Sequence, residues 1–197
     1  MLHEGVQPDK VIFLSVLGAC ASPMMLEQGY RIHSHIIAAR FYQDAFVGSA
    51  LVDMYAKCGN LQFSRHVFDY LRTKDVVSWT ALMSGYELQG DVKEALRIFY
   101  QMEESASVKP NEVTFVSVLN AITSLGTLDS GLSIHVTIIK YGYESNIYIA
   151  SALVDMYEKC GCLEDSFVMF IKMLHPDTTT WNTTIDGLAQ HGNPKKH

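Results

Sequence analysis

The sequence lacks the long apolar runs and cysteine pairs that mark several common protein classes. No apolar stretch approaches the roughly 18 consecutive residues that a membrane-spanning helix requires, so we expect no contact with a membrane. The cysteines form no CxxC pair, and a disulfide framework is not expected. The N-terminus, MLHEGVQPDK, has neither a secretory apolar core nor the Arg-rich, acid-poor character of a transit peptide. We therefore expect no targeting segment within this chain.

Basic charge and catalytic groups are also scarce. The 15 Lys and Arg residues stand against 21 Asp and Glu residues, and the net charge of −6 argues against a broad surface that coats nucleic acid. It leaves room for a narrow groove with a few well-placed lysines. His33 and His35 face different ways on a helix, and Cys160 and Cys162 suit packing at a turn better than metal binding. We predict no catalytic residue, no metal site and no cofactor, so the chain is not expected to be an enzyme.

What the sequence does contain is repetition. The run SALVDMYAKCG at 49–59 returns as SALVDMYEKCG at 151–161, an offset of 151 − 49 = 102 residues. The same offset relates Trp79 to Trp181 without a gap. A unit of 102 residues is thus present almost twice, and internal repetition of this kind indicates a repeat architecture.

Each unit divides into shorter segments with helical periodicity. A residue suited to cap a helix N-terminus precedes each of six apolar-periodic segments: Asp9, Asp44, Asp75, Asn111, Asn146 and Asp177. After these caps we predict helices that start near 10, 45, 76, 112, 147 and 178. We predict second helices near 25–40, 60–70, 91–104, 127–141 and 162–173. Turns are expected at glycines that can end a helix: Gly59, Gly90 and Gly161.

The predicted fold is therefore all-α, an α-α superhelix in which helical hairpins of 31 to 36 residues stack into a solenoid. No segment shows strand alternation of useful length. Neighbouring hairpins must stack because one hairpin cannot cover its own apolar face.

Hairpins near 34 residues occur in tetratricopeptide repeats, which bind peptides, and in pentatricopeptide repeats, which bind RNA. The segment DVVSWTALMSGYELQGDVKEALRIFYQM (75–102) resembles the standard pentatricopeptide motif of land plants, whereas 44–69 and 9–20 resemble its short and long variants. The order of the variants is similar to that of the plant P-L-S subfamily. The expected segments are the tail of a preceding repeat (1–8), long, short and standard repeats (9–43, 44–74, 75–110), and long, short and truncated standard repeats (111–145, 146–176, 177–197). Both ends cut through a repeat, as in a fragment.

The resemblance implies sequence-specific binding of single-stranded RNA, in organellar RNA processing or C-to-U editing, in a mitochondrion or chloroplast. Editing or processing proteins would act through regions absent from this chain. No HxE and no CxxC occurs, so the zinc site of a deaminase-like extension is not encoded here. The alternative is a helical-repeat scaffold for a peptide or protein partner. A line of lysines in the groove would favour RNA, and an apolar groove would favour a peptide.

The resemblance also implies which residues read bases, two per repeat and one base per repeat. The pair expected to select adenine is Thr80 with Asn111. The pairs expected to select guanine are Ser49 with Asp75 and Ser151 with Asp177, and Asn182 alone suggests a pyrimidine. The long repeats offer Leu14 with Asp44 and Val116 with Asn146, where an apolar side chain cannot hydrogen-bond a base edge. With the N-terminus toward the RNA 5′ end, the expected preference is n-G-A-n-G-Y.

Two further sets of residues are implied. The side chains expected to sandwich neighbouring bases are Val11, Phe46, Val77, Val113 and Tyr148. Lys57 and Lys159 are expected on the concave side, facing the RNA backbone. Several of these residues have simpler explanations that do not involve RNA. The Asp and Asn residues cap helices whatever the function, the lysines suit a helix C-terminus, and Trp79 and Trp181 suit a core better than a stacking platform.

Overall fold

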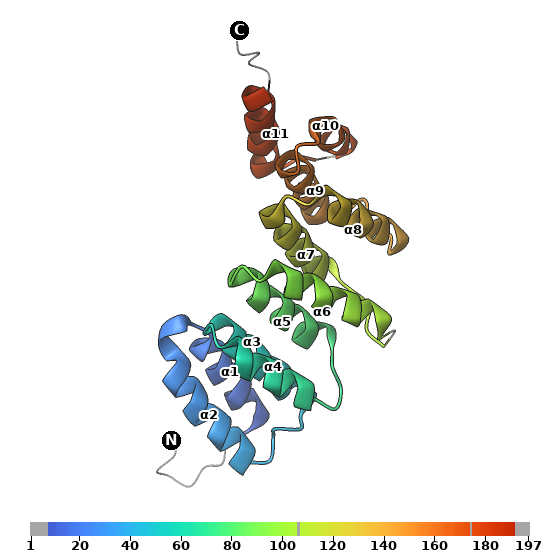
Figure 1. Ribbon diagram of the computed structural model, residues 1–197. Coiled ribbons are helices and arrows are strands. Elements are labelled where there is room, and N and C mark those ends of the chain that lie inside the picture. The colour runs from blue at the N-terminus through green and yellow to red at the C-terminus, as the bar shows by residue number, and fades with distance from the viewer. Residues whose placement is uncertain (1–7, 106, 174, 192–197) are drawn as a thin grey trace. The chain divides into compact units, whose positions relative to one another are not determined.

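The computed structural model describes residues 8–105, 107–173 and 175–191, and within these ranges the chain forms α-helices and one short 3-10 helix, with no strand (Figure 1). The all-α prediction is confirmed. The chain divides into two compact units, residues 1–109 and residues 110–197.

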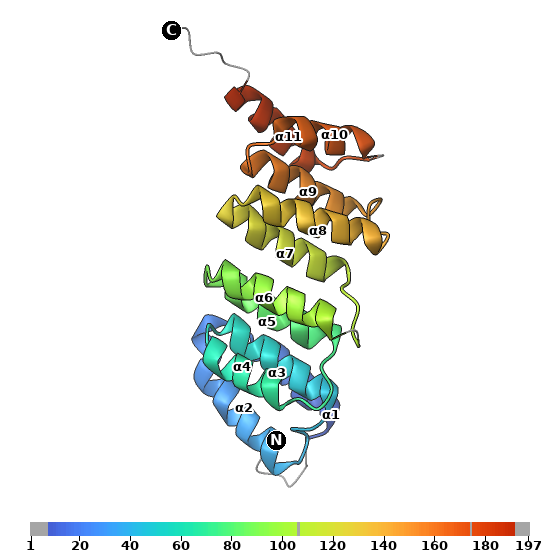
Figure 2. The ribbon, with the colours of Figure 1, turned by 45° about the vertical axis from the view of Figure 1, so that its right-hand side comes forward.

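Unit 1 contains three helical hairpins stacked in chain order (Figures 1 and 2). Their first helices are α1 (Lys10–Cys20), α3 (Ala45–Lys57) and α5 (Val76–Leu88). Their second helices are α2 (Leu26–Ala38), which follows the 3-10 turn η1 (Pro23–Met25), α4 (Leu61–Tyr70) and α6 (Val92–Glu104). Helix α3 packs against both α1 and α5, so the first helices form one layer and the second helices cover it.

Unit 2 repeats this arrangement. The hairpins α7 (Glu112–Leu125) with α8 (Leu128–Lys140) and α9 (Ile147–Lys159) with α10 (Leu163–Lys172) are followed by α11 (Thr178–His191). Helix α9 packs against both α7 and α11. The first helices of this unit are again neighbours in one layer.

All six first helices begin at the predicted residue, and the predicted caps explain why. The side-chain oxygen of Asp9 accepts from Ile12 N at 2.9 Å, and the other five caps accept from first-turn amides in the same way. The helices end at the predicted turns, where glycines with a φ near +80° take a conformation that other residues rarely adopt: Gly59, Gly90 and Gly161. The division of the hairpins into long, short and standard variants stays a prediction.

The 102-residue offset also holds for polar contacts between successive hairpins, from α2 to α3 and from α8 to α9. His33 Nδ1 lies 2.9 Å from the Tyr55 hydroxyl, and His135 Nδ1 lies 2.7 Å from the Tyr157 hydroxyl. Burial lowers the pKa of both imidazoles, and the neighbouring His66 and Lys172 respectively lower it further. These histidines therefore belong to the packing of the hairpins.

The two tryptophans differ in burial. Trp79 is 7% exposed and packs edge-on against Phe68, as predicted for a core residue. Trp181 makes the same contact with Phe170 but is 50% exposed, so its core prediction is wrong. The surroundings of the two helices differ, since α6 packs on α5, whereas the described residues contain no helix after α11.

In the described part of the chain, no single helix is long and apolar enough to cross a membrane. Taken together, α1 and the η1–α2 segment are long and apolar enough by length and composition alone, but they are bent by 119° relative to each other.

The close approach of α3 and α5 gives a test of the packing. A Cβ added at Gly85 would lie 2.8 Å from Ala56 Cβ and 2.7 Å from a methyl of Leu61. We predict that Gly85→Ala lowers the free energy of unfolding by about 1–3 kcal/mol, because the helices must move apart. Gly18→Ala is the matched control. Nothing lies within 4 Å of its added Cβ, and it should raise stability by up to about 1 kcal/mol. Thermal or urea unfolding measures both, and equal effects of the two variants would contradict this packing.

Candidate nucleic-acid interface

On two first helices, α3 and α9, the predicted sandwiching residue, the predicted base-reading serine and the predicted lysine lie on one stripe. On α3, Phe46, Ser49, Asp53 and Lys57 are spaced by 3, 4 and 4 residues, which places them one above another on a single helical face. The corresponding residues of α9 are Tyr148, Ser151, Asp155 and Lys159. The stripe therefore joins the apolar, base-reading and basic positions of the prediction on one surface in each unit.

The predicted sandwiching residues are all open to solvent. Their exposed fractions are 68% for Val11, 64% for Phe46, 55% for Val77, 58% for Val113 and 63% for Tyr148. The apolar residue that follows Phe46, Val47, is 0% exposed. These side chains recur two residues after each of five caps, so they offer a partner an apolar contact at the same position of successive repeats.

Ser49 and Asp75, a predicted base-reading pair, are in direct contact. The Ser49 hydroxyl donates to Asp75 Oδ1 at 2.8 Å, and the same oxygen accepts from Ser78 N. Ser49 is only 2% exposed, whereas Asp75 is partly exposed. Within the described residues Asp75 Oδ2 has no hydrogen-bond partner, so the open polar atom of this pair belongs to Asp75.

The second predicted guanine pair is joined through an additional residue. The hydroxyls of Ser151 and Thr180 lie 2.7 Å apart, and Thr180 Oγ1 donates to Asp177 Oδ1 at 2.6 Å. Hydrogen bonds from the Thr180 hydroxyl and backbone lower the pKa of Asp177, so this carboxylate stays ionised. Thr180 replaces Ser78 of unit 1, and its hydroxyl stands between the two members of the pair.

For the remaining predicted base-reading residues, the structure shows each residue by itself and no contact between the members of a pair. Thr80 is buried in unit 1, whereas Asn111 caps α7 in unit 2 by accepting from Thr114 N at 3.0 Å. Their pairing stays a prediction because it joins the two units. Asn182 is exposed on α11.

The caps that follow the long repeats have their polar atoms occupied. Asp44 Oδ1 accepts from the amides of Phe46 and Val47, and its Oδ2 accepts from Lys10 Nζ at 2.9 Å. Burial opposes ionisation, but the hydrogen bonds from Lys10 and the backbone amides keep the pKa of Asp44 below its usual value.

The equivalent cap in unit 2 is occupied too. Asn146 Oδ1 accepts from the amides of Tyr148 and Ile149, while its Nδ2 donates to Glu112 Oε2. Sequence reasoning missed both Lys10 and Glu112. The available signal was a charged residue directly after the cap of each long repeat, where the other first helices have Ala45, Val76, Ile147 and Thr178.

The two predicted phosphate-binding lysines are exposed and ion-paired on the stripe itself. Lys57 Nζ lies 2.7 Å from Asp53 Oδ2, and Lys159 Nζ lies 3.3 Å from Asp155 Oδ1, each one helical turn apart. Exposed pairs of this spacing contribute only about 0.3–0.5 kcal/mol, so a phosphate could displace the carboxylate. Their predicted register, one triplet apart on a concave side, joins the two units and stays a prediction.

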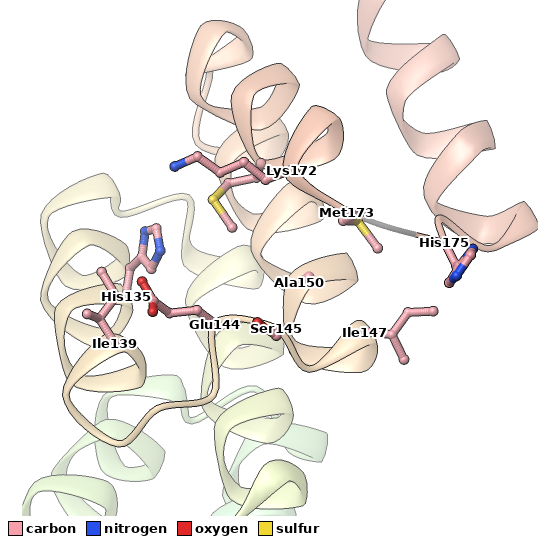
Figure 3. A pocket seen from close by; sticks show the side chains of 10 residues that line it. His135, Ile139, Glu144, Ser145, Ile147, Ala150, Lys172, Met173 and His175 are labelled. Atoms are coloured by element: carbon pink, nitrogen blue, oxygen red, sulfur yellow. The ribbon is translucent and has the colours of Figure 1, made fainter.

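Unit 2 also contains a pocket of about 420 Å³ that the sequence did not predict (Figure 3). It lies among α8, the segment before α9, α9 and α10, and its lining includes His135, Glu144, Ala150, Lys172 and Met173. The residues 102 positions before Ala150 and Met173 are Gly48 and Leu71, and in unit 1 this leucine packs tightly on this glycine. The pocket shares no residue with the base-reading stripe. No group of three or more His, Cys, Asp or Glu in residues 8–105, 107–173 and 175–191 could hold a metal ion.

Comparison with known proteins identifies several segments of the chain. The PPR repeat family matches residues 74–123, and the PPR repeat matches residues 148–175 and 179–196. Pentatricopeptide repeat-containing protein At2g33680 of Arabidopsis thaliana is 41% identical over 192 residues, covering 98% of this chain and 26% of that protein. Pentatricopeptide repeat-containing protein At1g11290, chloroplastic, of the same plant is 36% identical over 196 residues, covering 100% of this chain and 24% of that protein. The chain therefore spans about a quarter of the length of these curated relatives.

Solved structures share the fold. The crystal structure of the pentatricopeptide repeat protein PPR10 from maize matches 96% of this chain and 28% of its own chain, with a TM-score of 0.74 and 20% identity. The structure of PPR10 in complex with an 18-nt psaJ RNA element matches 94% of this chain and 27% of its own, with a TM-score of 0.73 and 23% identity. At these identities the likeness concerns the fold.

Proposed function

Because this chain contains repeats of the PPR family, we propose that it binds single-stranded RNA along the exposed stripe of its first helices, with one nucleotide at each repeat. The proposal rests above all on the five exposed apolar side chains that recur at the same helical position. An apolar or aromatic side chain there can stack against a base without regard to its identity. The adjacent cap residue supplies the polar atom that distinguishes one base from another.

The geometry at Asp75 supports base selection. Its Oδ1 is held by Ser78 N and the Ser49 hydroxyl, so the carboxylate has a fixed orientation, and its Oδ2 remains available. A carboxylate oxygen accepts from the imino N–H that guanine carries on its Watson–Crick edge. In this arrangement the Ser49 hydroxyl orients Asp75 by donating to its Oδ1, and Oδ2 of the carboxylate contacts the base. Together with Thr80/Asn111, Ser151/Asp177 and Asn182, this supports the preference n-G-A-n-G-Y.

We place this RNA binding in organellar RNA processing or C-to-U editing, in a mitochondrion or chloroplast. The support is that the relatives At1g08070 and At1g11290 carry the word chloroplastic in their names. The P-L-S subfamily is proposed from the order of the repeat variants. Editing or processing proteins would be partners of regions outside this chain.

A peptide- or protein-binding scaffold is the second candidate. The same exposed apolar residues could receive an apolar peptide, and each lysine on the stripe is balanced by an aspartate. The two functions differ in their dependence on salt. Each phosphate that a lysine contacts releases counterions, so RNA binding weakens as salt rises, whereas apolar peptide binding does not.

We predict that Thr80→Asn combined with Asn111→Asp changes the third preferred base from A to U and leaves the second and fifth bases unchanged. The asparagine and aspartate together present the groups that suit uracil in this family. Since six repeats, two of them weak selectors, bind poorly alone, residues 9–197 should be grafted into a longer array that anchors the RNA. Binding to RNAs that differ at the third base measures the change. Equal weakening for all RNAs would assign Thr80 and Asn111 to the stability of the hairpin instead.

We also predict that Lys57→Gln with Lys159→Gln weakens RNA binding about equally for all sequences. The slope of log affinity against log salt should fall by about one to two, because two phosphate contacts are lost. The matched control is Lys93→Gln with Lys140→Gln, which removes two exposed lysines from second helices and should leave the slope unchanged. If the two double variants behave alike, Lys57 and Lys159 only stabilise helix ends.

A further inference from the structure

The six caps differ in whether a polar atom remains for a base. At Asp75 and Asp177, the hydrogen bonds from neighbouring side chains go to Oδ1, and no side chain among the described residues bonds to Oδ2. At Asp44 and Asn146, the second polar atom is bound by a side chain from the preceding first helix. The occupied caps are those that the long repeats would use.

The occupying side chains stand at the same place in both units. Lys10 and Glu112 each follow directly after a cap, and each bonds to the cap 34 residues later. Their chemistry is matched to the partner. A lysine ammonium donates to the Asp44 carboxylate, and a glutamate accepts from the Asn146 amide. The donor is the residue after the first cap in unit 1 (Lys10) but the cap itself in unit 2 (Asn146). The second polar atom of the cap is therefore bound in both units, although the chemical groups that bind it differ.

Lys10 also shields the neighbouring stacking position. Its Nζ lies 4.1 Å from the centroid of the Phe46 ring, within the range of a cation–π contact. A base that stacked on this face of Phe46 would have to displace the ammonium from both the ring and Asp44.

We propose that Lys10 and Glu112 are specificity-determining residues that prevent the long repeats from selecting a base, by occupying the polar atoms of Asp44 and Asn146. The inference rests on the proposed RNA binding and adds a mechanism to it. An apolar Leu14 or Val116 removes one of the two selecting side chains, and the occupied cap removes the other. The first and fourth nucleotides are then bound without preference because both polar partners are withdrawn.

The two sites predict opposite consequences when the occupying residue is removed. In Lys10→Met, Asp44 Oδ2 becomes free, and a carboxylate accepts from the ring N–H of guanine and uracil but repels the ring lone pair of adenine and cytosine. In Glu112→Ala, the Asn146 amide becomes free, and its N–H group donates to the ring nitrogen of adenine and cytosine. The first position should gain G and U, and the fourth should gain A and C.

The test is selection by the full 197-residue chain from a pool of randomised eight-nucleotide RNAs, with sequencing of the retained molecules. The RNA is supplied at a concentration high enough to compensate for the weak binding of six repeats alone. The unaltered chain should enrich the second, third, fifth and sixth bases and leave the first and fourth even. Lys10→Met should enrich G and U about five- to tenfold at the first position, as one charge-assisted hydrogen bond allows. Glu112→Ala should enrich A and C about fivefold at the fourth position. Lys93→Met, which removes an exposed lysine from α6, is the matched control and should change no base.

Each alternative outcome has a distinct meaning. If the unaltered chain selects at the four expected positions but both variants leave the first and fourth even, the inference is overturned while the proposed function stands. If Lys10→Met only weakens binding to all RNAs, Lys10 contacts a phosphate and the inference is wrong at that site. If the unaltered chain retains no RNA above the level of a heat-unfolded sample, the proposed function fails, and the inference fails with it.

Discussion

The side-chain cap at the start of each first helix is the interaction on which the structure depends. The start of a helix has amide groups without partners, and a single Asp or Asn oxygen accepts from one or two of them in all six first helices. Because a carboxylate or amide has a second polar atom, the same residue can hold the helix and still face a ligand. The division of these two atoms between helix and ligand connects the fold to the proposed function.

Because the hairpins stack in a regular order, the cap residues and their second polar atoms recur at regular positions. Each first helix packs beside the next within its unit, and the second helices cover only one side of that layer. The opposite side keeps an exposed apolar side chain two residues after each of five caps. A fold that buried these side chains would have no surface for bases. A fold without the caps would have exposed apolar residues and nothing to distinguish one base from another.

Much of this could be predicted from the sequence because it is local. Helix starts follow from caps at regular spacing, and helix ends follow from glycines such as Gly59 and Gly161. The detailed geometry of the contacts between hairpins could not be predicted, although the resemblance had paired Ser49 with Asp75. The burial of Ser49 behind Asp75, the bond from Lys10 to Asp44 and the pocket beside Ala150 depend on how closely neighbouring helices approach. The exposure of Trp181, against the burial of Trp79 at the equivalent position, is likewise not visible in its own segment.

The central claim is that RNA lies on the exposed stripe of the first helices and leaves the second helices free. The most direct measurement is photocrosslinking of the chain to RNAs containing 4-thiouridine, followed by mass spectrometry of the linked peptides. The side chains to compare are Phe46 and Tyr148 on the stripe with Tyr70 and Tyr100 on second helices, all of which are exposed. The account predicts crosslinks at Phe46 and Tyr148. Crosslinks mainly at Tyr70 or Tyr100 would contradict it.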